Sequence, residues 1–135
     1  MEFINEISDV EALYFTIQPN NKNKMQSLKE RLKKLIDLYS HLFVIWFIYG
    51  NILALEEKYD KAIEIYNKAL KYDQHEPTST RLYHNLIVAH LSTGKVDDAI
   101  EIIKGLPIGI RTNPIIKSLI QHIEEKVGIE LQSRV

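Results

Sequence analysis

Hydrophobic residues recur along most of the chain at helical spacing, and short segments containing glycine, proline or polar residues separate the hydrophobic runs. No segment shows the strict alternation of apolar and polar residues that indicates a β-strand. The pattern therefore predicts an all-α protein of about seven helices. We expect them at residues 8–18, 22–39, 42–57, 60–72, 79–92, 95–104 and 114–127.

Several of the breaks carry recognisable helix start and stop signals. Gly94 and Gly128 stand where a helix is expected to end, and glycine adopts the left-handed conformation that often closes a helix. Asn113 followed by Pro114 combines a capping side chain with a proline at the first helical position. Pro77 is expected to close the fourth helix.

Large and small residues alternate in a specific order in the middle of the chain. The small residues Gly50, Ala62 and Ala69 would let two paired helices approach closely, while large side chains fill the space around them. The full pattern is Trp46, Tyr49, Gly50 and Leu53 on the first helix, then Tyr59, Ala62, Ile63, Tyr66, Ala69 and Leu70, and finally Pro77. This spacing resembles that of the tetratricopeptide repeat (TPR) family.

The flanking segments resemble the family less closely. A degenerate copy follows the clear repeat, with Ile87 at the position where the family has a small residue, and upstream only the hydrophobic register persists. The resemblance implies a single TPR-like domain over residues 1–135, folded as a short right-handed α-solenoid of antiparallel helix pairs. Degenerate repeats at about 8–40 and 79–107 would flank the clear repeat at 43–77, and a C-terminal helix at 114–127 would cap the stack.

Composition narrows the class of protein. A chain of 135 residues suits one domain, and its 45% hydrophobic and 26% charged content is typical of a soluble globular protein. The net charge of -1 provides no general attraction to nucleic acid or to an anionic membrane. Without cysteine the chain forms no disulfide, which fits a cytoplasmic protein. The most apolar run, 42–55, is interrupted and too short to be a membrane span.

No group of residues matches a known type of catalytic, cofactor or metal site. The glycines form no phosphate-binding motif, and the five histidines form no set with metal-ligand spacing. Adjacent carboxylates such as Asp97 and Asp98 diverge on a helix and cannot flank one bond. We therefore expect no enzyme activity, catalytic residue, cofactor or metal. The basic run from Lys22 to Lys34 makes nucleic-acid contact a less favoured alternative, because no aromatic side chains are interleaved with it.

The resemblance to TPR proteins also implies a function. In that family the first helices of successive repeats line a concave groove that receives a peptide or a helix of a partner protein. The chain is thus expected to act as an adaptor, scaffold or complex subunit. Helical spacing assigns to the groove the face that is not committed to packing: Phe47, Asn51, Leu55, Arg81, His84, Asn85, Val88, Lys117 and Gln121.

The expected groove differs from that of family members that bind acidic C-terminal tails. Asn51 and Asn85 correspond to asparagines of those proteins, but Phe47 stands where they use a lysine. Apolar Phe47, Leu55 and Val88 favour an amphipathic helix or an extended hydrophobic segment as ligand. Two alternatives stay open: the protein's own N-terminal helix fills the groove, or the repeats assemble into a homo-oligomer.

Overall fold

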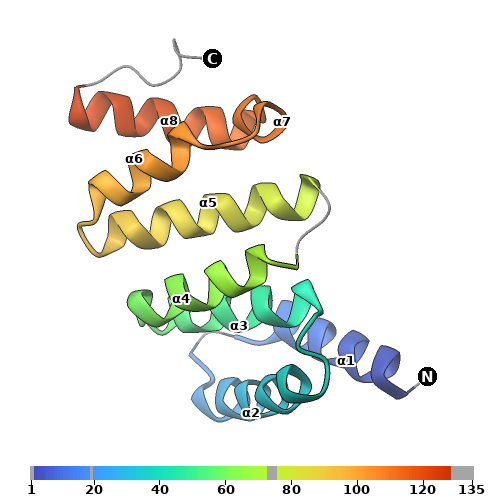
Figure 1. Ribbon diagram of the computed structural model, residues 1–135. Helices are drawn as coiled ribbons and strands as arrows, with labels where there is room; N and C mark the ends of the chain where they lie inside the picture. The colour runs from blue at the N-terminus through green and yellow to red at the C-terminus, as the bar shows by residue number, and fades with distance from the viewer. Residues whose placement is uncertain (1, 19, 73–75, 129–135) are drawn as a thin grey trace. The chain divides into compact units, whose positions relative to one another are not determined.

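The computed structural model describes the backbone of residues 2–18, 20–72 and 76–128, and the side chains in these ranges except for 2–6 and 76–78. Every regular element within these ranges is a helix, which confirms the all-α fold class. In chain order the helices are α1 (Glu2–Thr16), α2 (Lys22–Leu38), α3 (Phe43–Leu55), α4 (Tyr59–Leu70), α5 (Glu76–Ser92), α6 (Val96–Lys104), α7 (Ile108–Arg111) and α8 (Pro114–Val127) (Figure 1).

The predicted helices are all present, with differences at their ends. Helix α1 begins at Glu2 rather than at residue 8, and α4 ends at Leu70 without Pro77. Pro77 lies instead in the first turn of α5, where a proline removes no intrahelical hydrogen bond. The short helix α7 was not predicted. Residues 73–75 of the clear repeat lie outside the described ranges.

The helices form two compact units, which we describe separately. One unit spans Met1–Tyr72 and contains α1 to α4, and the other spans Asp73–Val135 and contains α5 to α8. The assignment of the whole chain to a single domain stays a prediction.

In the first unit, α3 and α4 form a tightly packed antiparallel hairpin (Figure 1). A Cβ atom built on Gly50 would lie only 2.6 Å from Cε1 of Tyr66, so glycine is what lets the ring reach the α3 backbone. Ala62 and Ala69 are fully buried in the same unit. This packing confirms the role expected for the small residues of the repeat. Trp46 is also buried, and its indole Nε1 donates a 2.7 Å hydrogen bond to the Ser40 carbonyl.

In the second unit, aliphatic side chains from all four helices form one core. Helix α7 contributes Ile110 to this core. The buried guanidinium of Arg111, also on α7, donates a 2.9 Å hydrogen bond to the Ile103 carbonyl near the end of α6. Helix α8 begins as expected, because the Asn113 side chain accepts a hydrogen bond from the Ile115 amide. The core consists of Ile87, Ala99, Ile103, Leu106, Ile110, Ile116, Ile120 and Ile123. Among the described residues, none of the helices combines the length and the apolar character required to cross a membrane.

Candidate functional site

The predicted groove residues belong to both units, so each group has its own surroundings. Helix α3 of the first unit carries three of them, and helices α5 and α8 of the second unit carry six. The α3 group is Phe47, Asn51 and Leu55, and the other group is Arg81, His84, Asn85, Val88, Lys117 and Gln121.

Asn51 connects three helices of the first unit. Its side chain is only 8% exposed, and its Oδ1 accepts a 2.6 Å hydrogen bond from the Tyr66 hydroxyl on α4. Tyr14 on α1 also shares a side-chain hydrogen bond with Asn51. Burial raises the pKa of the Tyr14 hydroxyl, and the hydrogen bond with Asn51 opposes that rise in part. The Asn51 amide thus ties α1 and α4 to α3.

Phe47 is likewise engaged within the first unit. Its ring stacks on Phe43 with centroids 5.5 Å apart and lies 6.4 Å from the Tyr66 ring. Helix α1 packs against α3, so the N-terminal helix covers part of the face that the sequence assigned to the groove. Leu55, which is 52% exposed, is the predicted groove residue of α3 that remains most accessible.

The contacts of Asn51 lead to a prediction about stability. Replacing Asn51 with alanine is expected to lower the free energy of unfolding by about 1 to 2 kcal/mol, since the buried Tyr66 hydroxyl loses its acceptor. Urea denaturation followed by circular dichroism would measure the change. Asn67→Ala, at an exposed position of α4, is the matched control and should change stability by less than about 0.5 kcal/mol. Equal stability of the two variants would show that the Asn51 bonds contribute nothing net.

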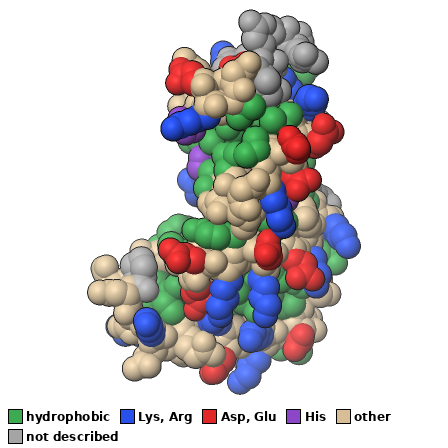
Figure 2. Space-filling view, turned by 90° about the vertical axis from the view of Figure 1, so that its left-hand side faces the viewer, with side chains coloured by type: hydrophobic (Ala, Val, Ile, Leu, Met, Phe, Trp, Pro, Cys, Tyr) green, Lys and Arg blue, Asp and Glu red, His purple; other side chains and the backbone are tan. Residues whose placement is uncertain are grey.

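The second unit carries a shallow depression between α5 and α8. Its volume is about 550 Å³. Ile115 at its edge is 58% exposed, and Val88, one turn beyond His84 on α5, is partly exposed as well. Figure 2 shows hydrophobic side chains at the surface of this unit with histidines beside them. The lining residues are His84, Pro114, Ile115, Ser118, Leu119 and His122.

The α8 residues that line the depression lie on one flank of the helix. Ile116 and Ile120 are buried in the core, and Ile115, Ser118 and His122 follow one side of that buried ridge. Lys117 and Gln121, which the sequence assigned to the groove, are exposed on the opposite flank. Of the predicted residues, the depression therefore includes His84 directly and has Val88 close by in the same helix. The other residues that line the depression were not in the predicted groove set: Pro114, Ile115, Ser118, Leu119 and His122.

The polar groups of the depression are arranged for hydrogen bonding. Nδ1 of His84 lies 3.2 Å from Oδ1 of Asn85. When Nδ1 carries the proton, the ring donates to Asn85 and keeps Nε2 as an acceptor. No group of three or more His, Asp or Glu side chains with metal-binding geometry occurs among the residues that the structure describes. An apolar side chain can pack on Ile115 and Leu119 while neighbouring polar groups bond to a peptide backbone.

Comparison with known proteins adds one match. A family model described as tetratricopeptide repeat matches residues 53–123, just over half of the chain. The matched segment includes the last residues of α3, all of α4 to α7, and the part of α8 that lines the depression. No curated protein gives a significant match to the sequence.

Proposed function

Because the chain belongs to the tetratricopeptide repeat family, we propose that it is a protein-interaction module whose α5–α8 face binds an apolar segment of a partner protein. Members of this family generally mediate protein–protein interactions, which supports the general role. The choice of face and of ligand chemistry rests on the residues of the second unit. An adaptor or scaffold role in the cytoplasm is part of this proposal.

The single observation that carries the proposal is the exposed apolar edge of the depression between α5 and α8. Ile115 and Val88 leave apolar surface in water beside a concave area of about 550 Å³. Burying one such aliphatic side chain against a ligand is worth about 1.5 to 3 kcal/mol. In protein interfaces, a few side chains that fill pockets contribute most of the binding free energy.

The polar residues favour a peptide or helix over a small apolar molecule. His84, His122 and Ser118 surround the apolar contacts with groups that donate and accept hydrogen bonds. These groups can satisfy the backbone of an extended segment or the polar edge of an amphipathic helix. The described residues that line the depression include no Lys, Arg, Asp or Glu, so an acidic tail is not the preferred ligand of this face.

A charge placed at the apolar edge tests the proposal. Ile115→Glu is expected to reduce recovery of co-purifying partners roughly tenfold, because it buries an unpaired carboxylate in the interface. The fold should tolerate it, since Ile115 is exposed and glutamate is favourable in the first turn of a helix. Affinity purification of the tagged protein from its native source, with quantitative mass spectrometry, gives the measurement.

Leu38→Glu provides the matched control, since Leu38 is 71% exposed but lies on α2 of the other unit. It should leave partner recovery unchanged. Equal recovery for wild type and Ile115→Glu would refute the assignment of the face. Light scattering after size-exclusion chromatography separates the self-assembly alternative: a mass that falls from an oligomer to a monomer in Ile115→Glu would identify the partner as a second copy of the chain.

A further inference from the structure

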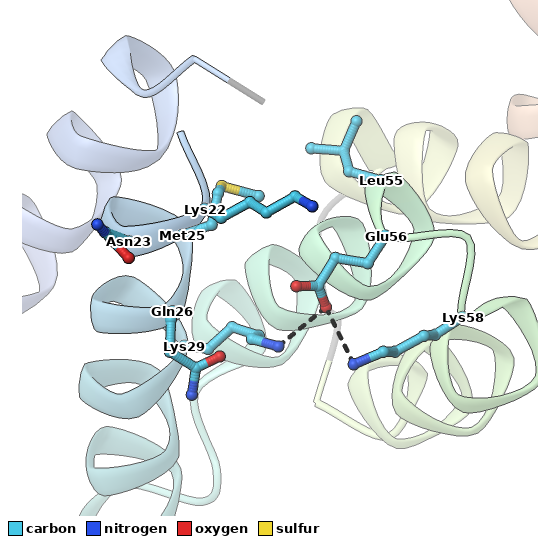
Figure 3. Close-up of a pocket in the computed structure, with 8 residues that line it drawn as sticks. All are labelled: Lys22, Asn23, Met25, Gln26, Lys29, Leu55, Glu56 and Lys58. Carbon is cyan, nitrogen blue, oxygen red and sulfur yellow. Dashed lines mark hydrogen bonds and ion pairs between the residues drawn. The ribbon is translucent and has the colours of Figure 1, made fainter. Parts of the chain in front are cut away.

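The first unit contains a second concave site, between the N-terminal half of α2 and the end of α3. Its volume is about 590 Å³. Figure 3 shows side chains from α2 on one side and, on the other, from the end of α3 and the turn that joins α3 to α4. The lining residues are Lys22, Asn23, Met25, Gln26, Lys29, Leu55, Glu56 and Lys58.

Two ammonium groups share one carboxylate in this pocket. Lys29 is buried, and its Nζ lies 3.0 Å from Oε1 of Glu56. Nζ of Lys58 lies 3.6 Å from the same oxygen (Figure 3). A buried lysine is stable only when its charge is paired, so Glu56 is required to neutralise Lys29 and has little capacity left for further cations.

Lys22 adds a third positive charge. Its side chain extends into the pocket from the start of α2 (Figure 3), and it forms no ion pair with any described residue. Among the described residues that line the pocket, three lysines stand with one glutamate, which gives a local excess of positive charge in a chain whose net charge is -1. This local field would attract a negatively charged ligand.

The position of Lys22 at the start of α2 is unfavourable for the stability of that helix. The first turn of α2 contains Lys22 and Lys24 and no acidic residue. Cations are unfavourable at the N-terminal end of a helix, where the macrodipole is positive. Residues that violate a local stability rule are often retained for function.

Apolar side chains complete the pocket. Met25 is buried and Leu55 is about half exposed, so the lysines adjoin aliphatic surface. None of the lining residues that the structure describes has an aromatic ring on which a nucleic-acid base could stack. Glu56 would also repel a closely spaced series of phosphates. A single carboxylate next to an aliphatic side chain matches this combination of charges and apolar contacts better.

We propose that this pocket binds an acidic segment of a partner protein, with an Asp or Glu carboxylate held by Lys22 and Lys58 and a neighbouring aliphatic side chain packed on Leu55. The inference rests on the proposed function, since it takes the chain to be a protein-binding module. It concerns a different surface from the α5–α8 face, lined by residues of α2, of the end of α3 and of the turn between α3 and α4.

A random-peptide display library provides the test. Phage are selected on the immobilised wild-type protein after depletion on the Lys22→Glu variant, so that peptides bound to other surfaces are removed. The surviving peptides are expected to carry Asp or Glu next to Leu, Ile or Met. Fluorescence anisotropy with the synthetic peptides should show binding that is at least roughly tenfold weaker for Lys22→Glu, and similarly weaker when glutamine and asparagine replace the acidic residues of the peptide.

Lys24→Glu is the matched control, because Lys24 lies on the same turn of α2 but does not line the pocket. It should change affinity by less than about threefold, the scale of a screened surface charge. Lys22→Glu should itself fold normally, since glutamate suits the first turn of a helix. Circular dichroism verifies the fold of both variants.

Three results would overturn the proposal. These are the absence of surviving peptides, survivors without acidic residues, and equal affinities for Lys22→Glu and Lys24→Glu. Binding of a single-stranded oligonucleotide that depends on Lys22 and falls steeply with salt, where acidic peptides do not bind, would assign the pocket to nucleic acid instead. If Ile115→Glu abolishes partner recovery while Lys22→Glu has no effect on any ligand, the proposed function stands and this inference alone fails.

Discussion

Gly50→Ala is expected to lower the free energy of unfolding by about 2 to 3 kcal/mol, the upper part of the range of about 1 to 3 kcal/mol that is typical of overpacked sites. In an unobstructed helix the same substitution would raise stability by about 1 kcal/mol, because alanine is the better helix former. The steric effect is expected to win at this position. The sign of the measured change therefore decides between local propensity and tertiary packing.

The physical reason is the Tyr66 ring. A Cβ atom on Gly50 would lie 2.6 Å and 2.7 Å from two ring carbons, closer than any normal contact. The ring cannot move aside without loss, since Tyr66 is fully buried and its hydroxyl is anchored on Asn51. Phe47 lies next to the same ring. Relief of the clash would therefore disturb the α3–α4 hairpin and the hydrogen bond that ties it together.

Gly105→Ala is the control for a glycine without such a neighbour. The nearest atom to a Cβ there is a backbone oxygen at 3.7 Å, so this variant should stay within about 0.5 kcal/mol of wild type. Tyr66→Leu should remove most of the penalty of Gly50→Ala, as measured by a double-mutant cycle in urea. A Gly50→Ala variant that is more stable than wild type would contradict the packing argument.

The α3–α4 hairpin was the part of the fold most accessible to prediction. Its small residues stand where two helices meet, and its large residues surround them, so the sequence leaves few ways to pair the helices. The boundary at Pro77 was wrong because proline fits equally well just after one helix or in the first turn of the next. Local signals cannot choose between these two positions.

Helix α7 was missed for a different reason. Pro107 and Gly109 both indicate a break, and a helix of four residues has no periodicity to detect. Its stability comes from tertiary contacts: Ile110 joins the core of the second unit, and Arg111 binds the Ile103 carbonyl. None of these contacts can be inferred from the local sequence.

The candidate site illustrates the same limit. Helical spacing placed Asn51 on an exposed groove face, but its side chain is only 8% exposed and forms hydrogen bonds with Tyr66 and Tyr14 from other helices. On α8, Ile116 and Ile120 form a buried ridge, and the helix has one exposed side on each flank of it. The sequence alone does not indicate which of the two sides lines a groove. Packing against α5 selects the flank that lines the depression.

Ile120→Ala is expected to have the largest effect on stability, a loss of about 3 kcal/mol in the free energy of unfolding. Ile120 is completely buried and belongs to the core that joins α5, α6, α7 and α8. Truncation removes favourable apolar burial and leaves a cavity that the neighbouring isoleucines can fill only in part. Urea denaturation measures the total loss. Amide hydrogen exchange should show the greatest loss of protection in α5 to α8, because helical repeats can open locally.

Ile115→Ala is the control that separates folding from binding. It makes the same chemical change on the same helix, but Ile115 is mostly exposed, so the free energy of unfolding should change by less than about 0.5 kcal/mol. Under the proposed function the two variants should diverge, since Ile115→Ala removes an interface contact and weakens partner binding without loss of stability. Equal losses of stability would contradict the assignment of one flank of α8 to the core and the other to solvent. The expected divergence follows from a helix that packs through Ile120 and leaves Ile115 exposed, where the proposed ligand would bind.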